Sequence, residues 1–453
     1  MTVELIHPWS GEVDYRYDYI DEVEVERILQ AAAQAAPAWA TRDLEDRGAM
    51  LRAVAAQLRG QREAIATTMT ADMGKLRREA LAEIEKSASA CEYYADHAID
   101  YLRDGMIATE AQRSYVTYEP LGCIFAVMPW NFPIWQVFRF LAPGLMAGNV
   151  AVLKHATNVP RCADAIARVL RDAGVPEGVF GVLHIDNSMA ARVIADSRVK
   201  AVTLTGSERA GSAVASAAGK HLKKCVMELG GSDPFLVLDD ADLDAAVPAA
   251  VASRFGNAGQ TCIAAKRFVV TPGIADAFVA RFTEAVGKLA VGDPNLDATT
   301  LAPMARADLR DEVHAQVRRS VAAGATLLIG GVPGQGGSHY PATVLDRVVP
   351  GMPAYHEELF GPAASILRAR DDDDAVRIAN DTDFGLGASV WTTDRARGEA
   401  VARRLQAGAT FVNAIVRSDV RLPFGGTKTS GFGRELAEHG IHEFMNIKTV
   451  YVA

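Results

Sequence analysis

The amino-terminal part of the chain carries apolar residues at helical spacing. Between residues 22 and 97, alanines and larger apolar residues recur every three or four positions in a sequence that is otherwise rich in glutamate. This period is typical of amphipathic helices. Polar residues interrupt the pattern at 41–46, so we predict two or three helices in this region.

From Gly122 onward, short apolar runs alternate with helical stretches. Apolar strands separated by helices are typical of a parallel sheet that is covered on both faces. A first series of strands is predicted at 123–128, 150–153, 182–185 and 199–205, with helices at 136–147, 161–173 and 189–196. A second series follows Gly231, with strands at 235–238, 267–270, 326–329 and 388–391 and helices at 241–255, 274–289 and 308–322. Two successive α/β units imply a cleft between them, which is where ligands usually bind.

Three further segments have recognisable polar patterns. Residues 112–118 and 443–452 alternate like strands with exposed edges. Such edges usually pair with another chain, so we expect an oligomer. The aspartate run at 371–374 predicts the exposed start of a helix, because negative charge suits the positive end of the helix dipole.

The composition narrows the class of protein. The 453 residues carry a formal net charge of −9, with 49% hydrophobic and 23% charged residues. This balance is that of a globular protein, and the acidic charge argues against a general nucleic-acid binder. Residues 1–10 lack a secretory signal pattern, and prolines and polar residues break the most apolar stretch, 121–138. We therefore expect a soluble cytoplasmic protein without a membrane segment.

The cysteines and histidines indicate neither a disulfide framework nor a metal site. The five cysteines are widely spaced and form no C-x-x-C motif. Of the ten histidines, His439 and His442 lie close together, but outside an H-E-x-x-H frame. We expect no metal, and reduced thiols of which one could be reactive.

A nucleotide site is a first candidate for function. The chain has neither a G-x-G-x-x-G motif nor a Walker A loop. However, Gly206 and Ser207 form a turn between the strand ending at Thr205 and a small-residue helix at 211–219, whose amino terminus could hold a phosphate. A tight strand-to-helix connection without a ligand explains this pattern equally well.

Three residues are candidates for catalysis. Cys262 follows a Gly-rich polar segment, an unusual place for a packed cysteine, although most free cysteines are inert small hydrophobes. A nucleophilic thiolate needs a base or oriented dipoles nearby, and Glu228, which follows an apolar strand, is the candidate base. Asn131, held between two prolines, could donate its amide to a developing oxyanion. On pattern alone, Glu228 could equally be a helix cap or a salt-bridge partner, and Asn131 is more typical of an Asx turn.

Together these segments resemble the aldehyde dehydrogenase superfamily, and the resemblance covers nearly the whole chain. Each segment alone is weak, but their shared order and approximate spacing are very specific. The segments are 129–133, Lys154 with its strand, 206–211, 228–231, 260–262, 357–362, and 423–426 leading to 430–435.

The resemblance implies roles for the three catalytic candidates. Cys262 matches the nucleophile that attacks the aldehyde to form a thiohemiacetal. Asn131 and the backbone N–H of Cys262 match the oxyanion hole. After hydride transfer to a nicotinamide, Glu228 matches the base that activates water to hydrolyse the thioester on Cys262.

The resemblance also implies a dinucleotide site. Lys154 and Glu358 match positions that hold the ribose hydroxyls of the cofactor. Ser207 matches a pyrophosphate contact, and Phe360 matches a contact near the nicotinamide ribose. The remaining residues of the expected cofactor site are Trp130, Thr157, Gly206, Arg209, Gly211 and Leu229.

The cofactor preference is predicted from one departure. NAD-preferring relatives often carry Glu three residues beyond the strand lysine, where its carboxylate holds the 2′-hydroxyl of the adenosine ribose and repels a 2′-phosphate. This chain has Thr157 there. With Lys154, His155 and Arg209 nearby, we expect the protein to use NADP as well as NAD.

The substrate class is predicted from the helix that follows the oxyanion candidate. Helical spacing places Trp135 and Arg139 on one face. The succinate-semialdehyde branch of the family has Arg at the Arg139 position, where the guanidinium reaches the distal carboxylate of the substrate. A second carboxylate-binding arginine of that branch is Gly256 here, and Arg417 and Ser418 are the candidate replacements. Alternatively, Arg139 and Arg417 are surface or interface charges.

We therefore predict an α/β protein with two Rossmann-like parallel-sheet domains and a small strand-based oligomerisation element. The expected boundaries are 1–98 with 120–229 for the cofactor domain, 230–432 for the catalytic domain, and 99–119 with 433–453 for the oligomerisation element of a homodimer or homotetramer. We expect Glu435 to be an exposed carboxylate at a helix start.

The expected activity is the NAD(P)-dependent, non-acylating oxidation of succinate semialdehyde, an aldehyde with a distal carboxylate. One alternative is a broader oxidiser of glutarate semialdehyde or simple aldehydes. Another is a catalytically silent nucleotide-binding member of the family.

Overall fold

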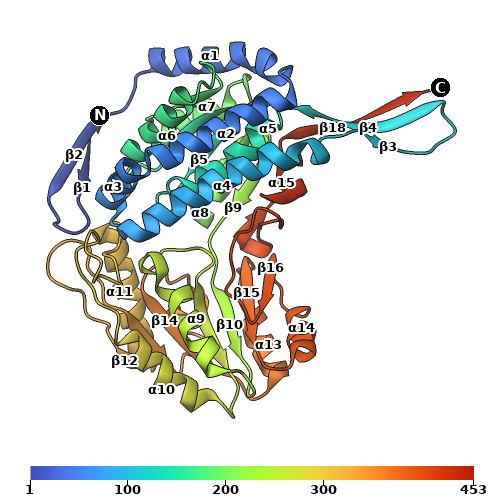
Figure 1. The fold of residues 1–453 in the computed structure, drawn as a ribbon. Helices are drawn as coiled ribbons and strands as arrows, with labels where there is room; N and C mark the ends of the chain where they lie inside the picture. Colours follow the sequence, from blue (N-terminus) through green and yellow to red (C-terminus); the bar gives the residue numbers. More distant parts are fainter. Residues whose placement is uncertain (1) are drawn as a thin grey trace.

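Two mainly parallel sheets organise the chain, which the computed structural model describes over residues 2–453. Figure 1 shows the sheets in two lobes, one above the other, with helices on both faces of each. The predicted α/β architecture with two parallel-sheet units is therefore confirmed. None of the helices within residues 2–453 has the length and apolarity needed to cross a membrane.

The first sheet has the strand order β17-β9-β8-β5-β6-β7. Its strands are β5 (Cys123–Met128), β6 (Val150–His155), β7 (Phe180–Val182), β8 (Val199–Thr205), β9 (Lys224–Glu228) and β17 (Gly431–Phe432). Strands β5 to β9 are parallel, and β17 pairs antiparallel with β9. The central strands are almost entirely buried, as expected for a parallel sheet with both faces covered.

The helices of the first lobe include the predicted amino-terminal group. They are α1 (Glu22–Ala40), α2 (Leu44–Gly60), α3 (Arg62–Met73), α4 (Arg77–Tyr101), α5 (Trp135–Met146), α6 (Pro160–Asp172), α7 (Asn187–Ala195) and α8 (Glu208–Lys220). Helices α1 to α4 fill the region where we predicted two or three helices. The extra boundaries lie at Gln61, which separates α2 from α3, and at the left-handed Gly74, which ends α3. One non-helical residue does not disturb apolar periodicity enough to be visible in the sequence.

The second sheet has the order β12-β13-β14-β11-β10-β15-β16. Its strands are β10 (Asp233–Val237), β11 (Ala265–Val270), β12 (Thr326–Ile329), β13 (Thr343–Asp346), β14 (Ala363–Arg368), β15 (Gly387–Trp391) and β16 (Ala409–Val412). The helices of this lobe are α9 (Leu243–Phe255), η1 (Gly256–Gly259), α10 (Ala275–Val286), α11 (Ala307–Ala322), α12 (Pro353–His356), α13 (Asp372–Asn380) and α14 (Arg395–Ala402). Strand β12 runs antiparallel at the edge, and the other strands pair in parallel.

The sequence prediction was wrong or silent at several elements. Residues 183–185 were predicted as a strand, but β7 ends at Val182. Strands β13, β14 and β16 and the hairpin of β1 (Thr2–Ile6) and β2 (Val13–Asp18) were not predicted. The aspartate run does begin a helix, because the Asp371 side chain caps α13.

The two segments with alternating patterns form a small separate sheet. Strand β18 (Met445–Val452) pairs along its length with β4 (Arg113–Pro120), and β3 (Gly105–Met106) pairs with the other edge of β4. Figure 1 shows β4 and β18 projecting away from both lobes. Apolar side chains of this sheet are exposed, including Ile447 and Tyr451. Its role in an oligomer stays a prediction.

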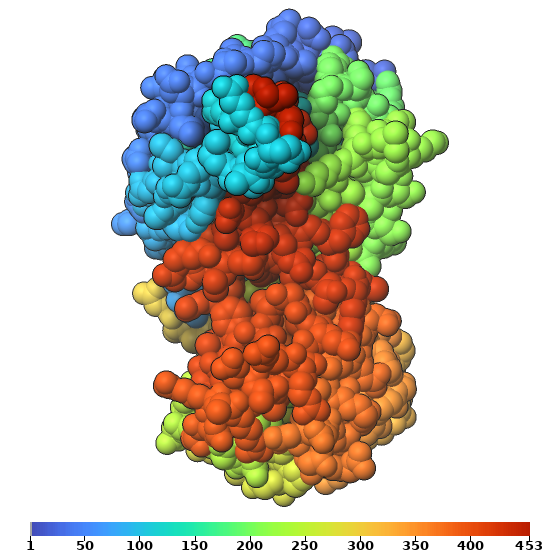
Figure 2. Space-filling view, turned by 90° about the vertical axis from the view of Figure 1, so that its right-hand side faces the viewer, coloured from blue at the N-terminus to red at the C-terminus, as the bar shows by residue number. Residues whose placement is uncertain are grey.

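The carboxy-terminal segment joins the two lobes. After β16, the chain passes through η2 (Lys428–Ser430) and β17 back to the first sheet, and then forms α15 (Ala437–His442). In Figure 2 this segment, coloured red, runs over both lobes. Because Gly431 pairs with Glu228, the segment reaches the strand end that carries the candidate base.

Candidate active site

The loop that carries Cys262 has an unusual backbone. Cys262 follows η1, in which Asn257 and Ala258 have left-handed φ values of 53° and 52°. Such conformations cost about 1–3 kcal/mol each in residues other than glycine, and they persist when surrounding contacts hold them. Gly259 has φ +71°, and a Cβ there would lie 2.3 Å from Gly361 O. Only glycine therefore permits this close approach of the two loops.

Arg254 connects the loop of Gly259 to the loop of Gly361. Its side chain is fully buried at the end of α9, and it donates hydrogen bonds to Gly259 O at 2.7 Å and Leu359 O at 3.2 Å. It also donates to the carbonyl oxygen of Gly361. One guanidinium thus fixes the Cys262 loop against the segment that carries Glu358.

Asn131 lies against the same loop, as the catalytic prediction requires. Its Nδ2 donates to Gln260 O at 3.0 Å, and Asn257 Nδ2 donates to Asn131 O at 2.9 Å. Asn131 is buried at the turn between β5 and α5. The structure therefore brings the amide of Asn131 next to the residues that precede Cys262.

A buried ion pair between Lys75 and Glu83 contacts the backbone of Asn131. The Lys75 ammonium pairs with Glu83 and donates to Asn131 O at 2.8 Å. The other oxygen of Glu83 accepts the backbone N–H groups of Ile134 at 2.8 Å and Trp135 at 2.9 Å, at the start of α5. This ion pair was not predicted from the sequence. Glu83 interrupts the apolar face of α4, and a charged residue at such a position indicates a buried partner.

Burial opposes the ionisation of the Cys262 thiol, whereas nearby positive charges favour it. Burial raises the pKa of the Cys262 thiol to about 11, while the positive charges of Arg139 and Lys266 lower it. Lys266 donates to Cys262 O at 2.8 Å and pairs with Glu358 at 3.1 Å. Without a ligand the thiol therefore holds its proton at neutral pH, and it needs a base to react.

Glu228 ends β9 in a deeply buried position. Its side chain is 2% exposed, and neither carboxylate oxygen has a hydrogen-bond partner among residues 2–453. Burial, followed by the negative charge of Glu435, raises the pKa of Glu228 well above its ordinary value. A carboxyl group tuned in this way is suited to proton transfer.

Two predictions near Glu228 need correction. Glu435 is not an exposed carboxylate, because it is 3% exposed and pairs with Arg139. Arg139 is not a surface charge, because its side chain is 2% exposed, and its predicted role at the substrate stays a prediction. Its guanidinium donates to Thr205 Oγ1 at 3.2 Å and stacks 4.6 Å from the ring centre of Phe424. Arg139 and Glu435 balance the charge of each other in this buried place.

Ser207, the expected pyrophosphate contact, lies at the start of α8 with other residues of the expected cofactor site. Ser207 is the N-cap, and its side chain accepts the N–H of Ala210 at 3.3 Å. The N–H of Gly206 donates to Glu228 O at 3.0 Å. A Cβ at Gly211 would lie 2.5 Å from Leu229 Cδ2, so Leu229 packs directly on this helix. The exposed helix start has free N–H groups of the kind that bind phosphate.

The other expected cofactor residues lie on neighbouring loops. Trp130 and Phe360 meet edge to face with ring centres 5.8 Å apart. Glu358 Oε1 accepts the N–H of Gly231 at 3.1 Å. At the end of β6, burial lowers the pKa of Lys154, and Thr157 O accepts a hydrogen bond from Tyr17 at 3.0 Å. Arg209 is exposed on α8.

A cavity of about 340 Å³ opens beside the catalytic loop. Thr261 and Ile263, the neighbours of Cys262 in sequence, both line it. Its other lining residues are Glu79, Ala82, Glu83, Lys86, Phe132, Trp135, Ala252, Ser253, Gly256, Asn257, Ile415 and Val416. Of the predicted substrate residues, Trp135 therefore lines the cavity, whereas Arg417 is exposed outside it. Ser418 is buried and accepts a hydrogen bond from Lys86.

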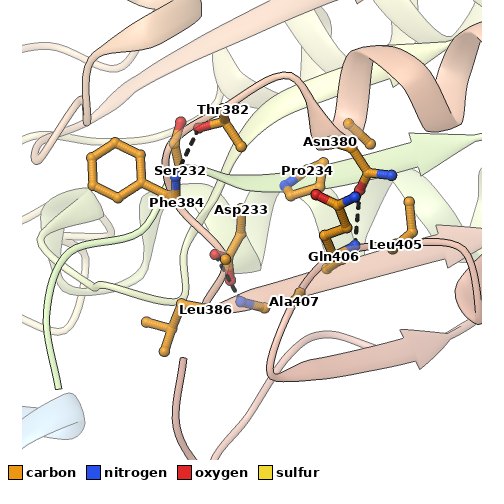
Figure 3. A pocket seen from close by; sticks show the side chains of 14 residues that line it. Ser232, Asp233, Pro234, Asn380, Thr382, Phe384, Leu386, Leu405, Gln406 and Ala407 are labelled. Atoms are coloured by element: carbon orange, nitrogen blue, oxygen red, sulfur yellow. Dashed lines mark hydrogen bonds between the residues drawn. The ribbon is translucent and has the colours of Figure 1, made fainter. Parts of the chain in front are cut away.

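A second, much smaller cavity lies in the catalytic lobe (Figure 3). Its volume is about 10 Å³, which is room for about one water molecule. Asp233, Thr382 and Gln406 are among its lining residues, and Asp233 Oδ1 accepts the N–H of Gly387 at 3.0 Å. Burial raises the pKa of Asp233 to about 7. A substrate larger than water does not fit this space. The cavity of about 340 Å³ borders the loop of Cys262 and is therefore the candidate substrate site.

Comparison with known proteins supports the family that the sequence motifs indicated. Residues 1–450 match the model of the aldehyde dehydrogenase family. The chain is 49% identical over 445 residues to the Escherichia coli (strain K12) protein named succinate semialdehyde dehydrogenase NAD(P)+ Sad, covering 98% of this chain and 94% of the relative. It is 48% identical, over the full length of both chains, to a Synechocystis protein named probable succinate-semialdehyde dehydrogenase NADP(+).

Solved structures give the same result. The structure of Gox0499 superposes with a TM-score of 0.98 at 39% identity over the whole of both chains. The structure of succinic semialdehyde dehydrogenase from Streptococcus pyogenes, in complex with NADP+, superposes with a TM-score of 0.97 at 38% identity over 99% of both chains. With this likeness in sequence and in fold, the chain belongs to the aldehyde dehydrogenase family.

Proposed function

We propose that the protein oxidises succinate semialdehyde to succinate, with NADP or NAD as the hydride acceptor. The observation that carries the proposal is the hydrogen bond from Asn131 Nδ2 to Gln260 O, two residues before Cys262, beside a cavity that Thr261 and Ile263 line. Glu228 is buried at the end of β9. Full-length relatives at 48–49% identity that are named for this reaction support the substrate.

The proposed chemistry assigns one step to each of these residues. The thiol of Cys262 loses its proton to solvent water, and its sulfur attacks the aldehyde carbon. The Nδ2 of Asn131 and the N–H of Cys262 stabilise the negative charge that develops on the aldehyde oxygen. The bound nicotinamide supplies the acceptor for the hydride that leaves this adduct. Glu228 then takes a proton from water as the water oxygen attacks the acyl carbon of the resulting thioester. The C–S bond breaks, which releases the acid and leaves Cys262 as a thiolate.

The residues present fit a dinucleotide cofactor. The open start of α8 offers backbone N–H groups to a pyrophosphate, and Leu229 packs beside it. Lys154, at the end of β6, would hold the adenosine ribose, and Thr157 leaves room for a 2′-phosphate. Glu358 would hold the second ribose beside the aromatic pair of Trp130 and Phe360.

A comparison of two aldehydes tests the proposed substrate. Succinate semialdehyde and butanal have four carbons each and differ in the distal carboxylate. We expect kcat/KM for the semialdehyde to exceed that for butanal by about 30-fold or more, because a charged hydrogen-bond pair contributes about 2 kcal/mol. The formation of reduced cofactor, followed at 340 nm, gives both values. Equal kcat/KM for the two aldehydes would contradict the substrate and favour a broader aldehyde oxidiser.

The cofactor preference is tested at position 157. In Thr157→Glu, a carboxylate would face the 2′-phosphate of NADP, so we expect the ratio of kcat/KM for NADP to that for NAD to fall about tenfold or more. Thr157→Gln is the matched control, since it has the same shape without the charge. A wild-type protein that rejects NADP, or a Thr157→Glu variant with an unchanged ratio, would refute this assignment.

A further inference from the structure

The substrate cavity contains a cation that the sequence analysis did not consider. Among the described residues that line it, Lys86 has the one positively charged side chain. Its ammonium lies 4.1 Å from the ring centre of Trp135 and donates a hydrogen bond of 2.6 Å to Ser418 Oγ. We propose that Lys86, oriented by Ser418, binds the distal carboxylate of the aldehyde substrate. This inference rests on the proposed function and names the residue that selects its substrate.

The ammonium of Lys86 lacks a direct counter-ion. Burial, followed by the charge of Arg139, lowers the pKa of Lys86 to about 8, against the opposite effects of Glu83, Asp419 and Cys262. Glu83 already pairs with Lys75. Asp419 forms its hydrogen bonds with Arg421. A substrate carboxylate would supply the missing partner through a charge-assisted hydrogen bond.

Glu79, the other carboxylate that lines the cavity besides Glu83, already has a hydrogen-bond partner. Glu79 Oε1 accepts the N–H of Asn257 at 3.0 Å. Burial raises the pKa of Glu79, which favours its neutral form and reduces repulsion of a substrate carboxylate. The cavity can therefore accept an anion at the Lys86 end.

The shape of the cavity connects Lys86 to the reacting atom. Thr261 and Ile263, the sequence neighbours of Cys262, line the same cavity as Lys86, and Cys262 is among the groups that act on the pKa of Lys86. Phe132 and Val416 add apolar surface to this lining. A cavity with apolar walls and one positive charge suits a short aldehyde that carries a carboxylate.

Arg139 is a weaker candidate for the same role. Its side chain is 2% exposed and is absent from the described lining of the cavity. Its charge is already balanced by Glu435. A substrate carboxylate on Arg139 would bring a second negative charge to a guanidinium that already balances Glu435.

Gly256 offers a way to rescue a loss of Lys86. Residue 256 lines the same cavity, has an ordinary backbone φ of −55°, and a Cβ there would meet no atom within 4 Å. An arginine at this position can therefore extend into the cavity from the end of α9 and replace the missing positive charge.

The test compares both aldehydes in a set of variants. In Lys86→Met, kcat/KM for succinate semialdehyde is expected to fall about tenfold or more relative to that for butanal, mainly through KM. Lys86→Arg, and the double variant Lys86→Met with Gly256→Arg, should regain most of the preference. Lys220→Met, at an exposed lysine at the end of α8, is the matched control and should keep the wild-type preference.

Inhibition of butanal oxidation by succinate is a second measurement, independent of semialdehyde turnover. Succinate should inhibit the wild type and lose about tenfold or more in affinity in Lys86→Met. A Lys86→Met variant that keeps both the preference and the inhibition would overturn the inference, as would an equal loss with both aldehydes. If the wild type does not prefer the semialdehyde but succinate inhibits through Lys86, the anion site stands and the proposed substrate is wrong.

Discussion

Replacing Cys262 with alanine is expected to reduce the formation of reduced cofactor by about 10⁴-fold or more, because the covalent path has no other nucleophile at this place. The loop around Cys262 keeps its shape through Arg254 and Asn257, which do not contact the sulfur through hydrogen bonds. The variant should therefore fold and bind cofactor normally, and only the chemical step should be lost.

The measurement is the rate of the 340 nm signal with succinate semialdehyde, with Cys225→Ala as the control. Cys225 lies in β9 and packs among apolar side chains, so its replacement should leave the rate within about twofold. A Cys262→Ala variant that still forms product at the wild-type rate would disprove the assigned nucleophile.

Glu228→Gln is expected to separate the two halves of the reaction. Without the carboxylate, water cannot be activated, so steady turnover should fall by about 10²-fold or more. Hydride transfer comes before this step, so a burst of reduced cofactor equal to the enzyme concentration should remain. Rapid-mixing absorbance measures the burst, and mass spectrometry of the trapped protein should detect the acyl group on Cys262. Fast steady turnover without a burst would contradict the role of Glu228.

The pH dependence of turnover provides a check on the same residue. Burial and the charge of Glu435 raise the pKa of Glu228, so the carboxyl group keeps its proton at pH values where an ordinary glutamate has lost it. Only the deprotonated form can act as a base. The steady rate should therefore rise with pH through the raised pKa of Glu228, and this rise should be absent from the slow residual turnover of Glu228→Gln.

Features of the fold and of the candidate site that depend on residues close together in the sequence could be predicted. Alternating apolar strands and helices gave the two α/β units, and the motifs around Asn131, Glu228 and Cys262 gave the candidate site because each motif lies in one short loop. Strands β13 and β14 were missed because their burial depends on a sheet assembled from distant segments.

The residues that the sequence did not reveal act across long stretches of chain. Lys75 reaches Asn131, and Arg139 reaches Glu435, only in the folded protein. Helical spacing predicted Trp135 and Arg139 on one face of α5. Trp135 lines the cavity, whereas Arg139 pairs with a carboxylate from the far end of the chain, which no local pattern reveals. Lys86 was missed because a lysine on a helix usually signals a solvated face.

The return of the carboxy-terminal segment to the first sheet has a consequence for biosynthesis. Leu229 N–H donates to Ser430 O at 3.0 Å, Ser430 Oγ donates to Gly230 O at 2.7 Å, and Glu435 balances the buried charge of Arg139. A ribosome must therefore release almost the entire chain before the surroundings of Glu228 can form. Until then the edge of β9 has no partner in β17, and an unpaired edge of this kind promotes aggregation. Products of premature termination that lack the last few dozen residues would consequently be inactive and poorly soluble, so the cell gains no partial activity from incomplete chains.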